Sequence, residues 1–122
     1  MAQLPNQTNF ATAAGSLWRQ TLKISDEAGP IDLTGLAWEF VLRPNVTDTA
    51  APAMVTVTTT PSSQGQIDVT PAEGIVTITL TRAATGPLKQ GSWAHALWSN
   101  PDTDTQICWC EGRFNTQLVA AA

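Results

Sequence analysis

The feature that most constrains the fold of this chain is an alternation of apolar and polar residues with a period of two. It is clearest in residues 36–43, and residues 75–81 repeat it. Successive side chains of a β-strand point to opposite faces of a sheet, so each run predicts a strand with one buried face. The residues expected to point inward are Leu36, Trp38, Phe40, Leu42, Val76, Ile78 and Leu80.

Several further segments have the same strand character, and turn-forming Gly, Pro and Asp residues separate them. No segment has the period of a long helix, and a single helical turn is expected near residues 85–90 with Thr85 as its cap. Seven or eight short strands at regular spacing predict an all-β, antiparallel, Ig-like β-sandwich. The expected strands are residues 17–24, 36–43, 54–60, 66–70, 75–81, 92–99, 105–111 and 113–119, with Gly112 marking a bulge or bend between the last two.

The 122 residues are enough for one domain. Residues 1–16 carry no charge and no periodicity, so we predict an extended N-terminal arm, followed by a β-sandwich domain over residues 17–119 and a C-terminal tail of residues 120–122. The arm has two interpretations: a frayed terminus, or a segment that becomes ordered on a neighbouring subunit. In the second interpretation Leu4 and Phe10 are its anchors.

The composition excludes several classes of function. Charged residues make up 13% of the chain, about half the usual share, and the formal net charge is −4. The basic surface of a nucleic-acid-binding protein and a polybasic membrane anchor are therefore both absent from the sequence. The first ten residues lack the basic and apolar regions of a secretory signal, so we expect synthesis in a cytoplasm. With one His and no Tyr, we predict a protein that is not an enzyme and needs no cofactor.

The groups that remain for chemistry are His95, Cys108 and Cys110. His95 shares a strand face with Trp93 and Leu97, so we expect a buried neutral imidazole bonded to the backbone rather than a catalytic base. The two Cys residues are expected on one face of a strand, where their side chains do not converge enough for a disulfide. Even with His95 they fall short of the four ligands of a zinc site, so we predict reduced thiols and no metal.

The five Trp residues are the best candidates for contact with a partner. Trp38 and Trp93 lie on inward faces and are expected in the core, whereas Trp98 lies on the opposite face of its strand and Trp18 near a sheet edge. Exposed Trp is typical of a protein interface or of a platform on which sugars stack. We therefore take Trp18 and Trp98 as candidate interface residues, beside the two anchors of the arm. The alternative is that all five Trp residues pack inside.

The segment that starts at Asp26 has the composition of a structural corner. Gly29 and Gly35 allow backbone angles that other residues avoid. Asp32 is expected to accept hydrogen bonds from nearby backbone N–H groups, as short Asp side chains do in turns. Leu33 is then expected to plug one end of the sandwich.

Three segments together, residues 17–44, 74–98 and 110–119, resemble a family of small β-sandwich proteins of tailed bacteriophages. The corner matches the family pattern D-x-x-G-x-x-D-L-T-G, and residues 80–91 match L-T-x-x-x-T-x-x-L-x-x-G. The domain is also similar to the N-terminal domains of siphophage upper baseplate proteins. The matching positions are turn and core positions, so the resemblance implies no catalytic residue. The chain departs from the family at position 95, where members often carry Tyr.

The resemblance implies a non-enzymatic structural component of a phage virion that connects or decorates the tail tip, baseplate or fibres in several copies. Its expected partners are other virion proteins, with no nucleic acid and no membrane. The many Thr residues and few charges on the outward strand faces suit a subunit of such a permanent assembly. Two alternatives stay open: a capsid decoration or head-fibre anchoring protein, and a module that binds host surface glycans through Trp98 or Trp18.

Overall fold

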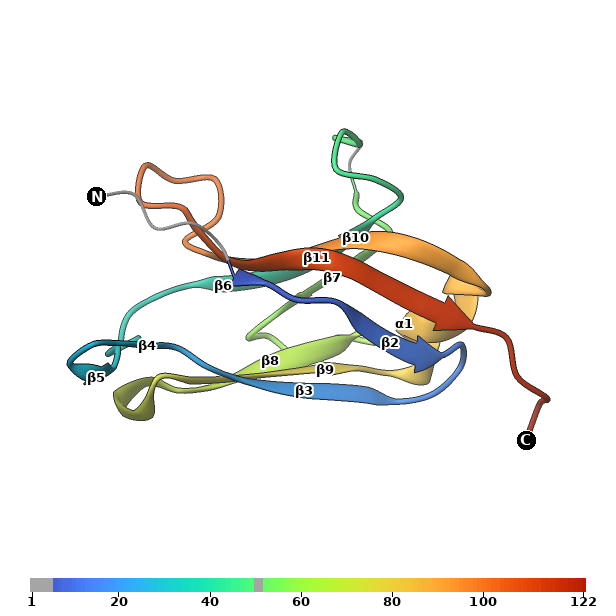
Figure 1. Ribbon diagram of the computed structural model, residues 1–122, viewed down its shortest axis with the longest axis horizontal. Coiled ribbons are helices and arrows are strands. Elements are labelled where there is room, and N and C mark those ends of the chain that lie inside the picture. Colours follow the sequence, from blue (N-terminus) through green and yellow to red (C-terminus); the bar gives the residue numbers. More distant parts are fainter. Residues whose placement is uncertain (1–5, 50–51) are drawn as a thin grey trace.

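The computed structural model describes residues 6–49 and 52–122 and shows an all-β sandwich, as the alternation predicts (Figure 1). The larger sheet has the strand order β1-β11-β10-β6-β7, and β2 also pairs with β11. Its strands are β1 (Asn6–Gln7), β2 (Phe10–Ala13), β6 (Trp38–Arg43), β7 (Val55–Thr58), β10 (Gly91–Ser99) and β11 (Ile107–Gln117).

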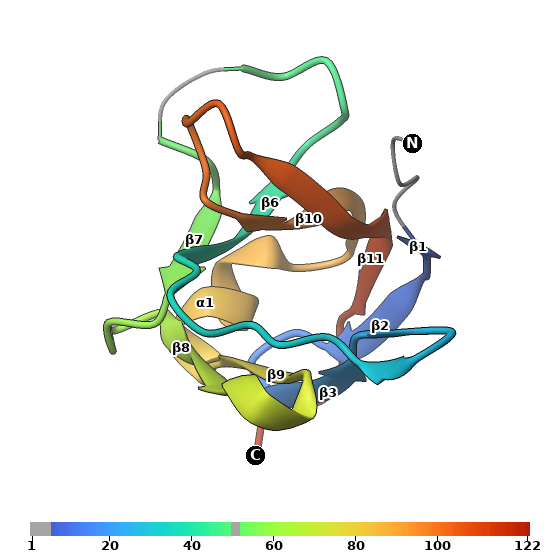
Figure 2. The ribbon, with the colours of Figure 1, turned by 90° about the vertical axis from the view of Figure 1, so that its left-hand side faces the viewer.

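The smaller sheet has the order β3-β9-β8, with both pairings antiparallel. Viewed end-on, the two sheets face each other, with β7 beside β8 on one side and β2 beside β3 on the other (Figure 2). The remaining elements are β3 (Trp18–Lys23), β4 (Ser25–Asp26), β5 (Gly29–Pro30), β8 (Gly65–Thr70), β9 (Ile75–Leu80), the helix α1 (Arg82–Thr85) and the 3-10 turns η1 (Pro71–Glu73) and η2 (Gly86–Leu88).

The core lies between the sheets and is built by the period-two alternation. In β6 the side chains of Trp38, Phe40 and Leu42 point inward and are almost completely buried. The inward residues of β9 are buried in the same way and face them from the smaller sheet. Burial of each such side chain stabilises the fold by about 1.5–3 kcal/mol, so this shared interior holds the two sheets together.

The helical turn lies slightly earlier than predicted, at residues 82–88 rather than 85–90. Thr85 is the last residue of α1 and stands at the N-cap position of η2, with Pro87 in the first turn as predicted, but its side chain makes no capping hydrogen bond. The Thr85 hydroxyl is fully buried, accepts a hydrogen bond from Gly15 N (3.1 Å) and donates one to Ser16 O (2.8 Å). These two hydrogen bonds therefore connect the turn between β2 and β3 to α1.

Residues 6–13 do not form part of the arm that was predicted for residues 1–16, so this prediction was wrong for them. Asn6–Gln7 and Phe10–Ala13 run parallel to β11 and extend the large sheet of the same chain. Parallel pairing of the first strand with the last is a long-range contact, which local periodicity does not reveal. The Phe10 ring packs in the core, with its centroid 5.1 Å from that of Trp18.

The last two predicted strands are one continuous strand, β11, and Gly112 does not interrupt it. The register shift lies instead opposite the step between Leu97 and Trp98 of β10. There Leu97 pairs with Cys110 and Trp98 pairs with Cys108, so Trp109 is the extra residue of a β-bulge.

Candidate functional site

The corner has the geometry that the sequence predicts for it. Gly35 has φ +82°, and Gly29 has φ +119° in the β4-β5 hairpin. The Asp32 carboxylate accepts hydrogen bonds from the backbone N (3.0 Å) and hydroxyl (2.6 Å) of Thr34, and these bonds hold the pKa of Asp32 below its ordinary value. Leu33 is almost completely buried in the core. The Asp26 carboxylate accepts a hydrogen bond from Ala28 N (2.8 Å), so both Asp residues of the corner bond to nearby backbone N–H groups.

Two of the four candidate interface residues lie inside the protein, so those predictions were wrong. Phe10 and Trp18 are each 7% exposed. Trp18 stacks on Phe40 (6.0 Å between centroids) and meets the edge of Phe114 (4.9 Å). Trp18 was predicted at an interface because it was expected near a sheet edge. β3 is indeed an edge strand, but the Trp18 side chain points into the core. Leu4 lies outside the described residues.

Trp98, the remaining candidate, lies on the outer face of the large sheet. The alternation that buries Leu97 directs Trp98 outward, where it is paired with Glu39 of β6 and Cys108 of β11. Ala94 and Ala96 precede it on the same face of β10, and Ala96 is paired with Val41. The alternative that all five Trp residues pack inside is therefore wrong for Trp98.

A groove of about 370 Å³ lies on this outer face. Its floor consists of small apolar side chains from β6 and β10, and the segment that follows β6 forms a wall above the sheet (Figure 1). Asn45 in that wall is fixed by its own turn, because its side-chain oxygen Oδ1 accepts hydrogen bonds from Thr47 N (3.1 Å) and Thr47 Oγ1 (2.6 Å). The residues that line the groove are Val41, Arg43, Asn45, Val46, Asp48, Ala94, His95, Ala96, Trp98, Cys108 and Glu111.

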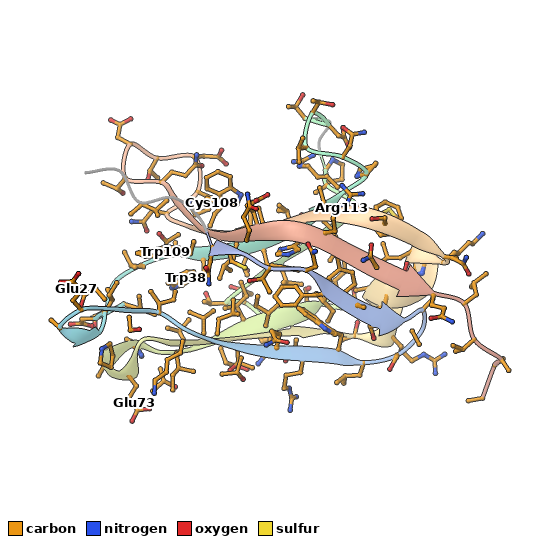
Figure 3. All side chains as sticks on the ribbon, in the orientation of Figure 1. Glu27, Trp38, Glu73, Cys108, Trp109 and Arg113 are labelled. Carbon is orange, nitrogen blue, oxygen red and sulfur yellow. The ribbon has the colours of Figure 1, made fainter. Side chains whose placement is uncertain are left out.

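The bulge in β11 separates the two cysteines, which were wrongly expected on one face. Cys108 lines the groove, whereas Cys110 is buried in the core (Figure 3 labels Cys108 above the large sheet). Both thiols are free, as predicted. Burial raises the pKa of each, so at neutral pH they are protonated and neither is an activated nucleophile.

Carboxylates border the groove and its neighbourhood. Glu111 lines it from β11, and Glu39 stands beside Trp98 on β6. The pKa of Glu39 is raised, mainly by partial burial and also by the negative charge of Asp102, while the positive charge of Arg43 opposes this shift. This side of the large sheet therefore combines apolar floor residues with groups of both charges.

His95 is the buried neutral histidine that the sequence predicts. It is 3% exposed, and its ring lies between Phe10 (4.7 Å between centroids) and Phe40 (5.6 Å). Nε2 lies 2.7 Å from the carbonyl oxygen of Thr8, so the neutral ring carries its proton on Nε2 and donates it there. Burial lowers the pKa of His95, and the bond to Thr8 and the charge of Glu111 only partly oppose that shift. The imidazole thus attaches the N-terminal strand to the large sheet.

A second surface feature lies at the end of the sandwich where β11 finishes. Leu17, Leu118 and Val119 are 57–59% exposed, and Val119 lines a shallow hollow together with residues 13–16 and the C-terminal alanines. The tail extends from this end of the molecule (Figure 1). We call Leu17, Leu118 and Val119 the apolar end. Period-two alternation did not single it out, because these residues flank strands rather than lie within them.

Within residues 6–49 and 52–122 no three His, Cys, Asp or Glu side chains come together in a way that would hold a metal ion. No helix in these ranges is both long and apolar enough to span a bilayer. No protein-family model matches the chain, and no curated protein matches it.

The floor of the groove was missed at the level of sequence. Its residues are Val41, Ala94 and Ala96, which point outward from their strands. Small apolar residues at three outward positions were the sequence feature that indicated this floor. Which outward residues lie side by side depends on the pairing of β6 with β10, which are separated by about half the chain.

Proposed function

We propose that this chain is a non-enzymatic structural subunit of a tailed-bacteriophage virion, present in several copies. The resemblance of residues 17–119 to small β-sandwich proteins of such phages supports the virion assignment. The corner that carries much of this resemblance is formed by turn and core contacts, which is the role that a structural scaffold requires. Both thiols are protonated and the imidazole is buried, which favours binding over catalysis.

The observation that carries the proposal is the apolar end. Single exposed aliphatic residues are normal on a protein surface, but three that are more than half exposed at one end favour contact with another protein. The hollow beside Val119 adds alanines from residues 13–14 and 120–122. In an assembled particle a neighbouring subunit would cover this surface. Connection to the tail tip, baseplate or fibres is the form we favour, and decoration of the capsid is the alternative.

Mass spectrometry of purified phage particles tests the virion assignment. We expect peptides of this chain in intact particles in more than one copy, and immunogold labelling then distinguishes a tail from a capsid position. Particles that are complete and infectious without the chain would contradict the assignment.

The role of the apolar end is tested by replacing Leu17, Leu118 and Val119 with Ser in the same chain. We expect the variant to fold normally, with an unchanged melting temperature, but to be absent from assembled particles. The matched control is Met54→Ser, since Met54 is also exposed but lies away from this end. Equal incorporation of the triple variant and the control would show that the apolar end is not the contact surface.

A further inference from the structure

We propose that copies of this chain associate head to tail, so that the apolar end of one copy contacts the opposite, acidic end of the next. This inference deepens the proposed function: it rests on the role of the apolar end as a contact surface and names a second copy of the chain as its partner. Three features of the described residues support it. They are the separation of charge between the two ends, the exposed apolar groups at each end and the rigid attachment of the segments that form the ends.

One end of the sandwich carries most of the acidic side chains. It is formed by the β4-β5 hairpin, the corner, η1 and the loop between β10 and β11, which lie on the left of Figure 1. Figure 3 labels Glu27 and Glu73 at this end. The carboxylates of these segments are all exposed, and Lys23 is the cation at the end of β3 that leads to them. We call the following residues the acidic end: Asp26, Glu27, Asp32, Glu73, Asp102 and Asp104.

The opposite end, where the apolar end lies, carries cations. Arg82 begins α1 and lines the hollow beside Val119, Lys89 follows η2, and Arg19 lies near the start of β3. All three cations are exposed. Every Asp and Glu of the sequence lies in the part of the chain that the structure describes. None of them belongs to the segments that form this end, which are residues 13–19, 81–91 and 116–122.

The two ends are therefore complementary in charge to each other, and neither is complementary to itself. Two apolar ends facing each other would bring cations such as Arg82 and Lys89 of both copies together, and two acidic ends would repel in the same way. An apolar end that faces an acidic end places cations against carboxylates instead. Charge complementarity of this kind selects both the partner and its orientation.

Apolar groups are exposed at both ends, so charge is not the only attraction between them. Leu17, Leu118 and Val119 are more than half exposed at one end. At the other end Ile107, the first residue of β11, is 39% exposed and follows the loop that carries Asp102 and Asp104. Burial of apolar groups drives association, whereas single exposed ion pairs contribute little to it. Contact between the two ends covers apolar groups on both copies.

Both ends are preformed surfaces. At the acidic end Leu33 N donates to Pro71 O (3.0 Å), which joins the corner to η1. Asn100 N donates to Ala37 O (2.7 Å), which joins the loop between β10 and β11 to the segment before β6. At the apolar end the hydroxyl of Thr85 joins the β2–β3 turn to α1. Surfaces held in this way lose little conformational freedom when they associate.

A head-to-tail contact continues past two copies, because each added copy still has one uncovered end. Successive copies form a closed ring if the rotation between neighbours closes, and an open row of copies if it does not. Both forms agree with a subunit that is present in several copies.

Sedimentation velocity of the purified full chain at increasing concentration tests the proposal. At low salt we expect species larger than a dimer as the chain approaches millimolar concentration. The same samples in about 1 M salt, where the Debye length falls to about 3 Å, should shift back towards the monomer.

Charge reversal at each end identifies the surfaces in contact. One variant combines Glu27→Lys with Glu73→Lys, and the other combines Arg82→Glu with Lys89→Glu. Each variant alone should associate about tenfold more weakly or worse, because like charges then face each other across the contact. A mixture of the two variants should associate again, since the unaltered apolar end of the first fits the unaltered acidic end of the second. A purely structural role of these four residues would not produce this rescue.

Asp68→Lys is the matched control, because Asp68 is exposed in the middle of β8, between the two ends. It should associate like the original chain. Melting temperatures of the variants verify folding. Reversal at either end tests the same contact, so one misfolded variant leaves the other informative.

A chain that stays monomeric at millimolar concentration and low salt would contradict the proposal. An assembly that stops at two copies, or that survives charge reversal at one of the ends, would also contradict it, because the contact would then join two identical surfaces. The virion role has a separate outcome. A chain that is present in phage particles but monomeric when purified keeps that role and loses the head-to-tail contact. A chain that associates as expected but is absent from particles loses the virion role instead.

Discussion

The outer faces of the two sheets differ, although the same alternation builds both sheets. On the smaller sheet the outward side chains bond to one another: the hydroxyls of Thr21 and Thr77 lie 3.1 Å apart, and Arg19 Nε donates to Thr79 Oγ1 at 3.2 Å. On the large sheet the outward residues around Ala96 and Trp98 leave a groove. The first face has hydrogen bonds between its own polar side chains, whereas the second has small apolar residues and the partly exposed Trp98.

This difference shows that the alternation determines which side chains are buried in the core. The chemistry of the outward residues determines which contacts the surface of each sheet can make. Thr is β-branched, suits a strand and bonds to its cross-strand neighbours, so the smaller sheet has a solvated outer face. Apolar residues on an outer face gain stability only when something covers them. The two outer faces therefore differ in the chemistry of their outward residues and not in the alternation that builds them.

The largest expected effect separates two Trp residues that sequence analysis grouped together. Trp18→Ala should cost about 3–5 kcal/mol of unfolding free energy, because it opens a cavity among core aromatic rings. Trp98→Ala should cost less than about 1.5 kcal/mol, because that side chain is only partly buried. Urea denaturation of both variants measures the difference. Equal losses would mean that Trp98 belongs to the core and that the two outer faces are alike.

The next effect concerns the attachment of the N-terminal strand to the large sheet. Gly112 has φ +154°, and a Cβ there would collide with the Thr8 carbonyl. Gly112→Ala should therefore cost about 2–4 kcal/mol. Gly35→Ala should cost only about 1–2 kcal/mol, because Gly35 has positive φ but open space around it.

Gly86→Ala is the control for these two variants, because Gly86 has an ordinary helical φ of −57° and no close neighbour. Its melting temperature should equal or exceed that of the original chain. A Gly112→Ala variant as stable as this control would show that β1 and β2 do not lie against β11.

A smaller effect on the free energy of unfolding, dependent on pH, is expected from His95, which points from β10 into the core. Its folded pKa lies below its ordinary value of 6.5, so the unfolded chain binds a proton at a higher pH than the folded one. The stability is therefore fully present above pH 6.5 and falls as the pH drops from 6.5 towards the folded pKa. Chemical denaturation between pH 8 and pH 5 measures this slope.

His95→Gln should flatten this part of the pH dependence, because the amide of Gln does not titrate and its N–H is able to donate to Thr8. The carboxylates still contribute at lower pH in both proteins. An identical slope in the variant between pH 7 and pH 6 would show that His95 does not carry the effect.

The smallest effect is expected on the outer face of the smaller sheet. Thr77→Ala removes one exposed hydroxyl pair and should change the unfolding free energy by no more than about 0.5 kcal/mol. Differential scanning calorimetry measures it. A loss above about 2 kcal/mol would show that the Thr pairs are a major source of stability rather than a solvated surface.

Much of the fold was predictable because its signals are local. The inward residues of β6 and β9 follow from alternation, and the corner follows from turn chemistry at Asp32 and Gly35. The buried state of His95 follows from its strand face. Each of these features depends on residues within a few positions of one another.

The features that were missed depend on contacts between distant segments. Residues 6–13 have no strand periodicity, and only their pairing with β11 places Phe10 in the core. The bulge that separates Cys108 from Cys110 arises from the register between β10 and β11. The groove likewise requires β6, β10, β11 and the segment after β6 to come together, so it was not visible from any one strand.

The most direct test of the alternation that places Trp98 outside and Trp18 inside is an NMR spectrum of the ¹⁵N-labelled chain with and without a soluble paramagnetic agent. Five indole N–H signals report the five Trp residues separately. We expect the indole signal of Trp98 to lose intensity, while the signals of Trp18 and Trp38 keep theirs. Equal attenuation of the Trp98 and Trp18 signals would contradict the assignment of Trp98 to the outer face of the large sheet.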